Sequence, residues 1–303
     1  MCSSDLDKLL FASSNNFCPP PGGCEDVEAD DDVNGVSWTA SISYDFADGQ
    51  FIPYITASEQ ATMIVGQGAE ATVGNVADGG VFDESELFEF GIKGSLLNNS
   101  LYYAISVYEQ ERTDFSAQSI VTNQATKTEG AEVEVRWVVN ENLLLTFGYS
   151  NIEVTNLNTE EAGFRFSFIG CDDLPNIPCH LLYGGTLGGF VANTASGSKR
   201  AGMPENIYTM TGRYDFGNGW AVNGSIIDVD SVDSGYSGAV QLPAYTLVNL
   251  GFSYETEDWL FSVSGKNLTD EEYFRSNFPN LFGGVIVLPE LPRHYNARIQ
   301  YKF

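Results

Sequence analysis

Basic residues are scarce in this 303-residue chain. It holds 14 Lys and Arg against 41 Asp and Glu, which gives a formal net charge of −27. Such a surface repels a phosphate backbone, which argues against a nucleic-acid partner. Histidine is scarcer still, with two residues, and neither lies in the sequence context of a hydrolase triad or of a zinc site. We therefore expect no enzymatic activity, no metal centre and no cofactor.

Long apolar runs are also missing. No stretch approaches the roughly 20 consecutive apolar residues that a membrane-spanning helix needs. The first residues, MCSSDLDKLLFASSNN, have neither the basic region nor the apolar region of a signal peptide. We expect Met1 to be either a cytosolic start or the edge of an incomplete sequence.

The chain is rich instead in segments with a period of two. In the final segment, YNARIQYKF, apolar and aromatic residues alternate strictly with Asn, Arg, Gln and Lys. This alternation is typical of β-strands with unlike faces. It recurs in about eleven segments of roughly ten residues, the length that crosses a bilayer when the strand is tilted. The segments lie near 38–46, 51–58, 88–93, 101–108, 131–137, 143–150, 208–216, 220–226, 248–255, 259–266 and 295–303.

Short and long connections alternate between these segments. Tight turns rich in Asn, Asp or Gly lie at 46–50, 96–100, 139–142, 216–219 and 255–258, and long loops lie near 58–85, 112–127, 155–204, 231–242 and 267–292. In an up-and-down meander, alternate connections fall at the same end of the sheet. The pattern predicts an all-β, antiparallel meander with its tight turns at one end, as in bacterial outer-membrane barrels. A soluble β-sandwich is the alternative.

Aromatic residues gather beside the tight turns, where the interfacial girdle of a membrane barrel is found. If the sheet is such a barrel, the apolar side of the last strand faces lipid and its polar side faces the lumen. We therefore expect Ile299 to face lipid and Arg298 to face the lumen, because neighbouring strand residues point to opposite faces.

Two stretches near the C-terminus resemble the C-terminal signature of TonB-dependent outer-membrane receptors. They are GKNLTDEEYF (265–274) and PRHYNARIQYKF (292–303). The residues that match the signature are Asn267, Leu268, Thr269, Asp270, Tyr273, Pro292, Arg293, Tyr295 and Phe303. Upstream segments are similar to the mid-barrel hairpins of the same family, so the resemblance extends over most of the chain.

The resemblance implies a location in the bacterial outer membrane and a closed barrel of 22 strands around an N-terminal plug. Residues 1–303 then form the C-terminal half of that barrel, and we expect the plug, the TonB box and the first half of the barrel to be absent from this chain. TonB would bind the missing N-terminal part. Lipid and lipopolysaccharide would surround the barrel, and the barrel-insertion machinery would read the last strand.

Substrate-specific, energy-coupled uptake is the function that this resemblance implies, with ferric siderophores as the expected cargo. Within the same machinery, the alternatives are cobalamin, a carbohydrate or another nutrient. Among other classes of outer-membrane protein, the alternatives are a passive porin and an enzyme. An enzyme would need an acid/base set at the lumen or the rim, and none is evident. We expect the chain on its own to be unable to transport.

Four of the five cysteines are candidates for local disulfides in expected external loops. Cys18 and Cys24 bracket PPPGG, and Cys171 and Cys179 bracket DDLPNIP. Oxidation in the periplasm favours two small disulfide loops over free thiols. The acidic stretch EDVEADDD (25–32) lacks the spacing of a calcium loop, and we expect it to be a solvated external loop.

Overall fold

We describe the protein from a computed structural model. The residues that it describes are 4–14, 27–63, 82–112, 115–118, 121–123, 125–157, 164–168, 186–190, 196–200, 202–234, 240–276 and 287–302. Every named element in these ranges is a β-strand. Across the same ranges there is no helix with the length and hydropathy needed to cross a membrane.

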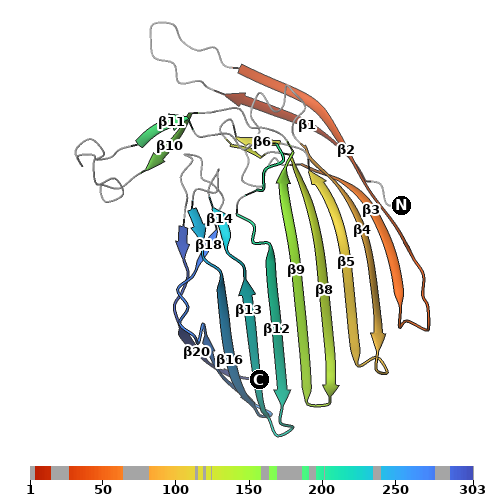
Figure 1. The fold of residues 1–303 in the computed structure, drawn as a ribbon, viewed down its shortest axis with the longest axis vertical. Coiled ribbons are helices and arrows are strands. Elements are labelled where there is room, and N and C mark those ends of the chain that lie inside the picture. Colours follow the sequence, from red (N-terminus) through yellow and green to blue (C-terminus); the bar gives the residue numbers. More distant parts are fainter. Residues whose placement is uncertain are drawn as a thin grey trace.

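A sheet of 12 strands dominates the structure, and each strand lies antiparallel to its neighbours (Figure 1). The order in the sheet is β1-β2-β3-β4-β5-β8-β9-β12-β13-β16-β17-β20, which is an up-and-down meander. The strands are β1 (Ser4–Ser14), β2 (Val27–Ser43), β3 (Ile52–Met63), β4 (Phe82–Leu96), β5 (Leu101–Arg112), β8 (Thr126–Asn140), β9 (Leu143–Asn156), β12 (Asn206–Asp215), β13 (Trp220–Val229), β16 (Tyr245–Glu255), β17 (Trp259–Lys266) and β20 (His294–Tyr301). The predicted all-β meander is confirmed.

Tight turns join β2 to β3, β4 to β5, β8 to β9, β12 to β13 and β16 to β17 at one end of the sheet, the lower end in Figure 1. Short polar side chains and glycines shape them. The Oδ1 atom of Asn140 accepts hydrogen bonds from the backbone N–H groups of Asn142 at 2.9 Å and Leu143 at 3.0 Å. Gly217 and Gly219 adopt φ values of 73° and 87°, which glycine tolerates best.

The longer connections lie at the opposite end of the sheet and contain four small two-stranded sheets of their own (Figure 1). The predicted segregation of short and long connections is therefore confirmed. The strands of these hairpins are β6 (Phe115–Gln118) with β7 (Val121–Asn123), β10 (Phe164–Phe168) with β11 (Thr186–Phe190), β14 (Val232–Ser234) with β15 (Val240–Leu242), and β18 (Phe274–Ser276) with β19 (Val287–Pro289).

The sheet begins with a strand that the sequence pattern did not indicate. β1 pairs with β2 from Ser4 opposite Ser37 to Ser14 opposite Val27. β2 therefore includes residues 27–32, most of the acidic stretch, and the expectation that this stretch is a loop is wrong for those residues. A strand without regular alternation gives no period-two signal, and its backbone pairing does not depend on the side chains.

The cross-strand register sorts side chains into rows. Ile55, Phe90, Val107 and Ala131 stand opposite one another on β3, β4, β5 and β8. Directly opposed residues of antiparallel strands project to the same face of the sheet. We call the face that carries this row the apolar face.

The neighbouring row lies on the other face, which we call the polar face. It contains Thr56, Glu89, Tyr108 and Gly130. The Tyr54 hydroxyl, also on this face, donates a hydrogen bond to the Glu89 carboxylate. At least one pair of polar side chains on this face is thus hydrogen-bonded across neighbouring strands.

The same division extends to the last strand. An apolar row contains Trp220, Tyr254, Phe261 and Ile299, and the adjacent row on the polar face contains Ala221, Ser253, Ser262 and Arg298. Ile299 and Arg298 therefore lie on the apolar and polar faces, respectively, as the alternation predicts.

The apolar face is exposed in this structure. The exposed fractions of Ile42, Val263 and Ile299 are 72%, 53% and 68%. Among the residues whose burial the structure describes, the buried hydrophobic ones are Ala61, Val154, Ala221, Val229, Val232 and Leu242. A soluble sandwich would cover such a face with a second sheet. This sheet therefore needs apolar surroundings.

Aromatic side chains mark the turn end of the sheet, as the sequence indicates. The rings of Trp220 and Tyr254 lie 4.7 Å apart between centroids, and those of Trp259 and Tyr301 lie 4.8 Å apart. Each pair is formed across neighbouring strands beside a tight turn. The aromatic rings thus form a belt along one edge of the apolar face.

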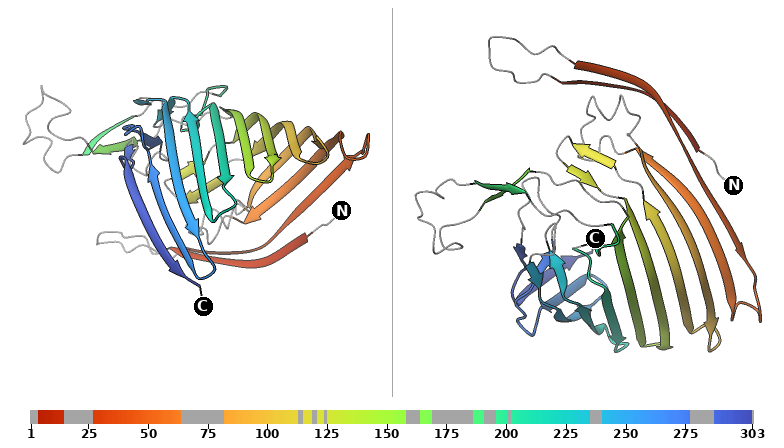
Figure 2. Two further views of the ribbon diagram at one scale, coloured as in Figure 1. Left: turned by 90° about the horizontal axis from the view of Figure 1, so that it is seen from below. Right: turned by 45° about the horizontal axis from the view of Figure 1, so that its top comes forward.

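The sheet is curved, as the view from below in Figure 2 shows. Within the described residues its order starts at β1 and ends at β20, and these two strands are not paired with each other. Their outer edges carry backbone groups that a closed barrel would satisfy by pairing.

The turn between β12 and β13 provides a test of the tight-turn geometry. A Cβ atom on Gly219 would lie 2.4 Å from the Glu255 backbone oxygen, and the positive φ adds strain. Gly219→Ala should lower the free energy of unfolding by about 1–3 kcal/mol, measured by urea unfolding in lipid vesicles. Gly224→Ala is the matched control, because its Cβ would make only an ordinary 3.5 Å contact with the Asn249 backbone oxygen. Equal destabilisation by both substitutions would contradict the claim that position 219 requires glycine.

Candidate functional site

The first half of the predicted C-terminal motif folds into a tight structure directly after β17. Asn267 has a left-handed φ of 50° and is 3% exposed. Its side-chain Nδ2 donates to the Glu271 backbone oxygen at 2.8 Å, and its Oδ1 accepts from the Glu271 N–H at 2.8 Å. Its own N–H donates to Oδ1 of Asn249 at 2.9 Å. Asparagine suits this position because it tolerates the left-handed region and can bond to nearby backbone.

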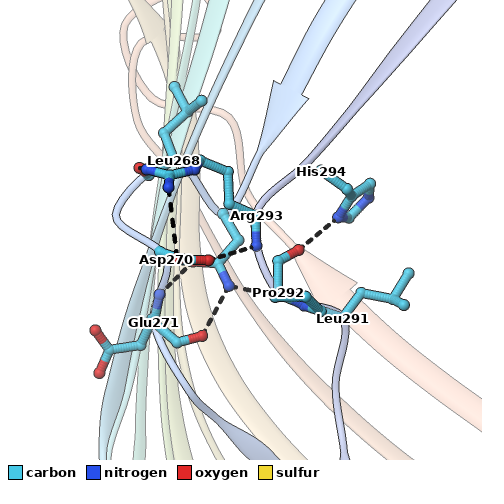
Figure 3. Close-up of polar contacts among 8 residues, drawn as sticks. Leu268, Asp270, Glu271, Leu291, Pro292, Arg293 and His294 are labelled. Atoms are coloured by element: carbon cyan, nitrogen blue, oxygen red, sulfur yellow. Dashed lines mark hydrogen bonds and ion pairs between the residues drawn. The ribbon is translucent and has the colours of Figure 1, made fainter.

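The second half of the motif is joined to the first through Asp270 and Arg293 (Figure 3). The Oδ1 atom of Asp270 accepts a hydrogen bond from the Arg293 N–H at 2.9 Å, and its Oδ2 lies 3.5 Å from Nη2 of Arg293. The Arg293 Nη1 donates to the Leu268 backbone oxygen at 3.4 Å. Nδ2 of Asn267 reaches the Leu291 backbone oxygen at 3.4 Å. These contacts, which we call the motif clasp, close the loop between β17 and β20.

Apolar contacts support the motif clasp from the end of β17. A Cβ on Gly265 would lie 2.6 Å from Leu268 and 2.9 Å from the ring of Tyr295, so only glycine allows both side chains to pack there. The ring of Tyr273 lies 4.7 Å from that of Tyr245. These residues therefore hold the loop against the sheet.

Ionisation of Tyr273 is disfavoured in this position. Burial raises the pKa of its hydroxyl above the usual value, the Glu290 carboxylate raises it further, and Arg275 opposes the change. Tyr273 therefore stays neutral at physiological pH and packs as an uncharged ring.

The remaining motif residues have lesser roles or lie outside the described ranges. Pro292 offers its backbone oxygen to Nδ1 of His294 at 2.9 Å. Thr269 is exposed. Phe303 lies outside the described residues, as do the disulfide candidates Cys18, Cys24, Cys171 and Cys179. The motif therefore positions the loop between β17 and β20 and the start of β20.

A second polar network on the long-loop side was not predicted. The Tyr149 hydroxyl donates to Oδ1 of Asn206 at 2.8 Å, and Nδ2 of Asn151 donates to the same atom at 2.9 Å. Nδ2 of Asn206 donates to Oδ2 of Asp230 at 2.6 Å. The sequence contains one indication of this network. Asn151 and Asn206 stand near the long loops, at positions of β9 and β12 where the alternation would place an apolar residue.

The described residues were compared with the requirements of a metal site. No group of three or more His, Cys, Asp or Glu side chains in these ranges is placed to hold a metal ion. The candidate site is instead a set of long connections at one end of the sheet. Side-chain hydrogen bonds, in the motif clasp and in the second polar network, hold these connections in place.

The motif clasp can be tested by removing its central side chain. Asn267→Ala leaves three backbone groups without this partner and places alanine at positive φ, so the free energy of unfolding should fall by about 2–4 kcal/mol. Urea unfolding in lipid vesicles measures this change. Thr269→Ala is the control in the same loop and should have no measurable effect. If the two variants were equally stable, the motif clasp would not organise the loop.

Comparison with known proteins agrees with this architecture. Residues 13–268 match the family model described as TonB dependent receptor-like, beta-barrel. The siderophore receptor PiuA from Acinetobacter baumannii has a similar structure, with a TM-score of 0.68 and 15% identity over 94% of this chain and 38% of that chain. The ferric-catecholate import receptor Fiu from E. coli, in its closed form, gives a TM-score of 0.66 and 17% identity over 99% of this chain and 41% of that chain.

The unliganded ferric citrate transporter FecA gives a TM-score of 0.64 and 14% identity, over 91% of this chain and 39% of that chain. At these identities the likeness concerns the fold, and this chain spans between 38% and 41% of the length of the three structures. No curated protein matches the sequence closely enough to serve as a relative. Since the family model covers most of its residues, the chain belongs to the TonB dependent receptor-like β-barrel family.

Proposed function

We propose that this chain forms part of the transmembrane barrel of a receptor in the bacterial outer membrane, and that the receptor takes up ferric siderophores by a TonB-dependent mechanism. The observation that carries the proposal is the exposed apolar face of the sheet. A continuous face of Ile, Val, Phe and Tyr side chains is stable only against an apolar solvent or a large partner. The aromatic belt along one edge favours lipid.

The dimensions of the apolar face suit a bilayer. On β12 and its following turn, alternate residues from Tyr208 to Phe216 are apolar or glycine. Eight residues extend about 26 Å along a strand, and a tilt of about 40° leaves about 20 Å across the membrane. That is comparable with the apolar band of about 25 Å on outer-membrane barrels.

Carboxylates mark the upper limit of the apolar face on the neighbouring strands. Above Val107 and Ala131 the same face carries Glu109 and Glu129, which stand opposite each other. Lys127 lies between them, 2.8 Å from the Glu109 carboxylate and 3.6 Å from that of Glu129. Exposed charges of this kind belong in water rather than in hydrocarbon, so we place the membrane boundary between these rows.

The choice of cargo rests on the structural neighbours. By their titles, similar structures include a siderophore receptor, a ferric-catecholate import receptor and a ferric citrate transporter. Another is the complex of FpvAI with pyocin S2. The first three names support a ferric complex as the ligand class. We expect the ligand to approach from the long-loop end of the sheet.

The same proposal assigns the other partners. Lipid and lipopolysaccharide surround the apolar face, the barrel-insertion machinery acts on β20, and TonB acts on another part of the receptor. The plug and the remaining strands also lie elsewhere in the receptor. No catalytic step is assigned to this chain.

Uptake of radiolabelled iron tests the transport function. Cells whose receptor contains this chain should accumulate a ferric siderophore from the medium, because the barrel and its loops provide the route. Accumulation should stop when TonB is deleted or when a protonophore removes the proton gradient. Uptake that survives both treatments would show passive diffusion, and the porin alternative would replace this proposal.

A further inference from the structure

Three Asn-Gly pairs occur in the chain, and the structure places one of them in a tight turn. The pairs are Asn34-Gly35, Asn218-Gly219 and Asn223-Gly224. The first lies in β2 and the third in β13, whereas the second lies in the connection 216–219 between β12 and β13. An asparagine that precedes glycine can react with the next backbone nitrogen, because glycine has no side chain to hinder the approach. The reaction also needs a backbone that is free to bend, and a turn provides this more readily than a paired strand.

The contacts of the turn favour this reaction at Asn218. The Asn218 side chain is exposed, and its Oδ1 accepts a hydrogen bond from the Trp220 N–H at 3.3 Å. The N–H of Gly219, between these two residues, donates no hydrogen bond to any residue that the structure describes. The Gly219 nitrogen is therefore available for attack on Cγ of Asn218. The Trp220 N–H can stabilise the negative charge that develops on Oδ1 during that attack.

The Asn-Gly pair in β13 is restrained on both sides. Gly224 stands opposite Gly212 of β12 and opposite Leu250 of β16, so its N–H lies within a ladder of backbone hydrogen bonds. The Asn223 carboxamide lies against β16, where a Cβ on Gly251 would be 2.7 Å from its Oδ1. Attack of the Gly224 nitrogen on Asn223 therefore requires β13 to open first, and strands in the interior of a sheet open rarely.

We propose that Asn218 is a site of spontaneous deamidation in the folded receptor. The Gly219 nitrogen forms a bond to Cγ of Asn218, which closes a five-membered succinimide ring. The C–N bond of the carboxamide breaks, and its nitrogen leaves as ammonia with the proton of the Gly219 N–H. Water then opens the ring at one of its two carbonyl groups. The products are aspartate, which keeps the original backbone, and isoaspartate, in which the chain runs through Cγ.

Isoaspartate alters the turn, because its backbone is one atom longer before Gly219. The Gly219 backbone oxygen accepts a hydrogen bond from the Glu255 N–H at 2.8 Å, which links the turn to the end of β16. The packing is close, since a Cβ on Gly219 would lie 2.4 Å from the Glu255 backbone oxygen. The longer backbone displaces Gly219 from this position and weakens the link. Deamidation therefore loosens the joint between the β12–β13 hairpin and β16.

Ageing of the purified complete receptor in lipid vesicles, at mildly alkaline pH, tests the site. Tandem mass spectrometry of its peptides measures the conversion of each asparagine. Asn218 should react at least about tenfold faster than Asn223, because reaction at Asn223 requires the ladder to open. In receptor unfolded in urea, the two pairs should react at similar rates. Equal rates in the folded receptor, an unchanged Asn218 there, or the same preference for Asn218 in urea would overturn the proposal.

The effect of isoaspartate on the turn is tested with the Asn218→Ser variant. Serine has no carboxamide and cannot form the ring, so ageing should leave the urea midpoint of this variant unchanged. The parent receptor, aged in the same way, should unfold at a lower urea concentration than before ageing. An equal loss in the parent and the variant would assign the damage to other residues, and it would contradict the claim that isoaspartate at position 218 loosens the turn.

Discussion

The cross-strand register of the sheet is the constraint on which the other features depend. Because side chains alternate between faces, a shift of one residue in any strand would place its Phe and Ile side chains among Ser and Glu. In the observed register, apolar rows continue from β3 to β8 and again from β13 to β20. The exposed apolar face, the aromatic belt and the polar face all follow from that alignment.

The ends of the strands fix this register. At one end, the tight turns are short, which limits how the strands that they join can pair. At the other end, where loops are long, side chains take over that role. Asn267 and Asp270 bind the backbone of their own loop and of the segment that leads into β20. The motif clasp therefore sets where the last strand begins, which a long loop could not do by its length alone.

The distribution of charge also follows from the two faces. Cross-strand carboxylates occur where the apolar face rises above the proposed membrane boundary, and like charges there are tolerated because water surrounds them. On the opposite face at the same height, Arg200 is half-buried and lies near the exposed Arg112. The negative charge of the chain is thus unevenly distributed between the two faces in the upper rows of β5, β8 and β9.

Much of the fold could be predicted from the sequence, because alternation and turn residues are local signals. The strands of the 12-stranded sheet from Trp38 onward, the antiparallel meander and the separation of tight turns from long loops were predicted in this way. The four two-stranded sheets lie in stretches that were expected to be loops. β1 and the acidic beginning of β2 were not, since neither has a regular alternation. The clasp residues were identified only through resemblance to a family motif. Their contacts join Asp270 to Arg293 across a loop, and no local pattern specifies such a partner.

The central claim is that the apolar face of the sheet contacts lipid. It is tested most directly by placing the same charge on the two faces of β17. Val263 lies on the apolar face and Ser264 on the polar face. Val263→Arg should lower the folded, heat-modifiable fraction of the receptor in outer-membrane preparations, because arginine near the bilayer midplane costs about 2–4 kcal/mol. Ser264→Arg should leave that fraction close to the parent value. Equal fractions for the two variants, or a larger loss for Ser264→Arg, would contradict the claim.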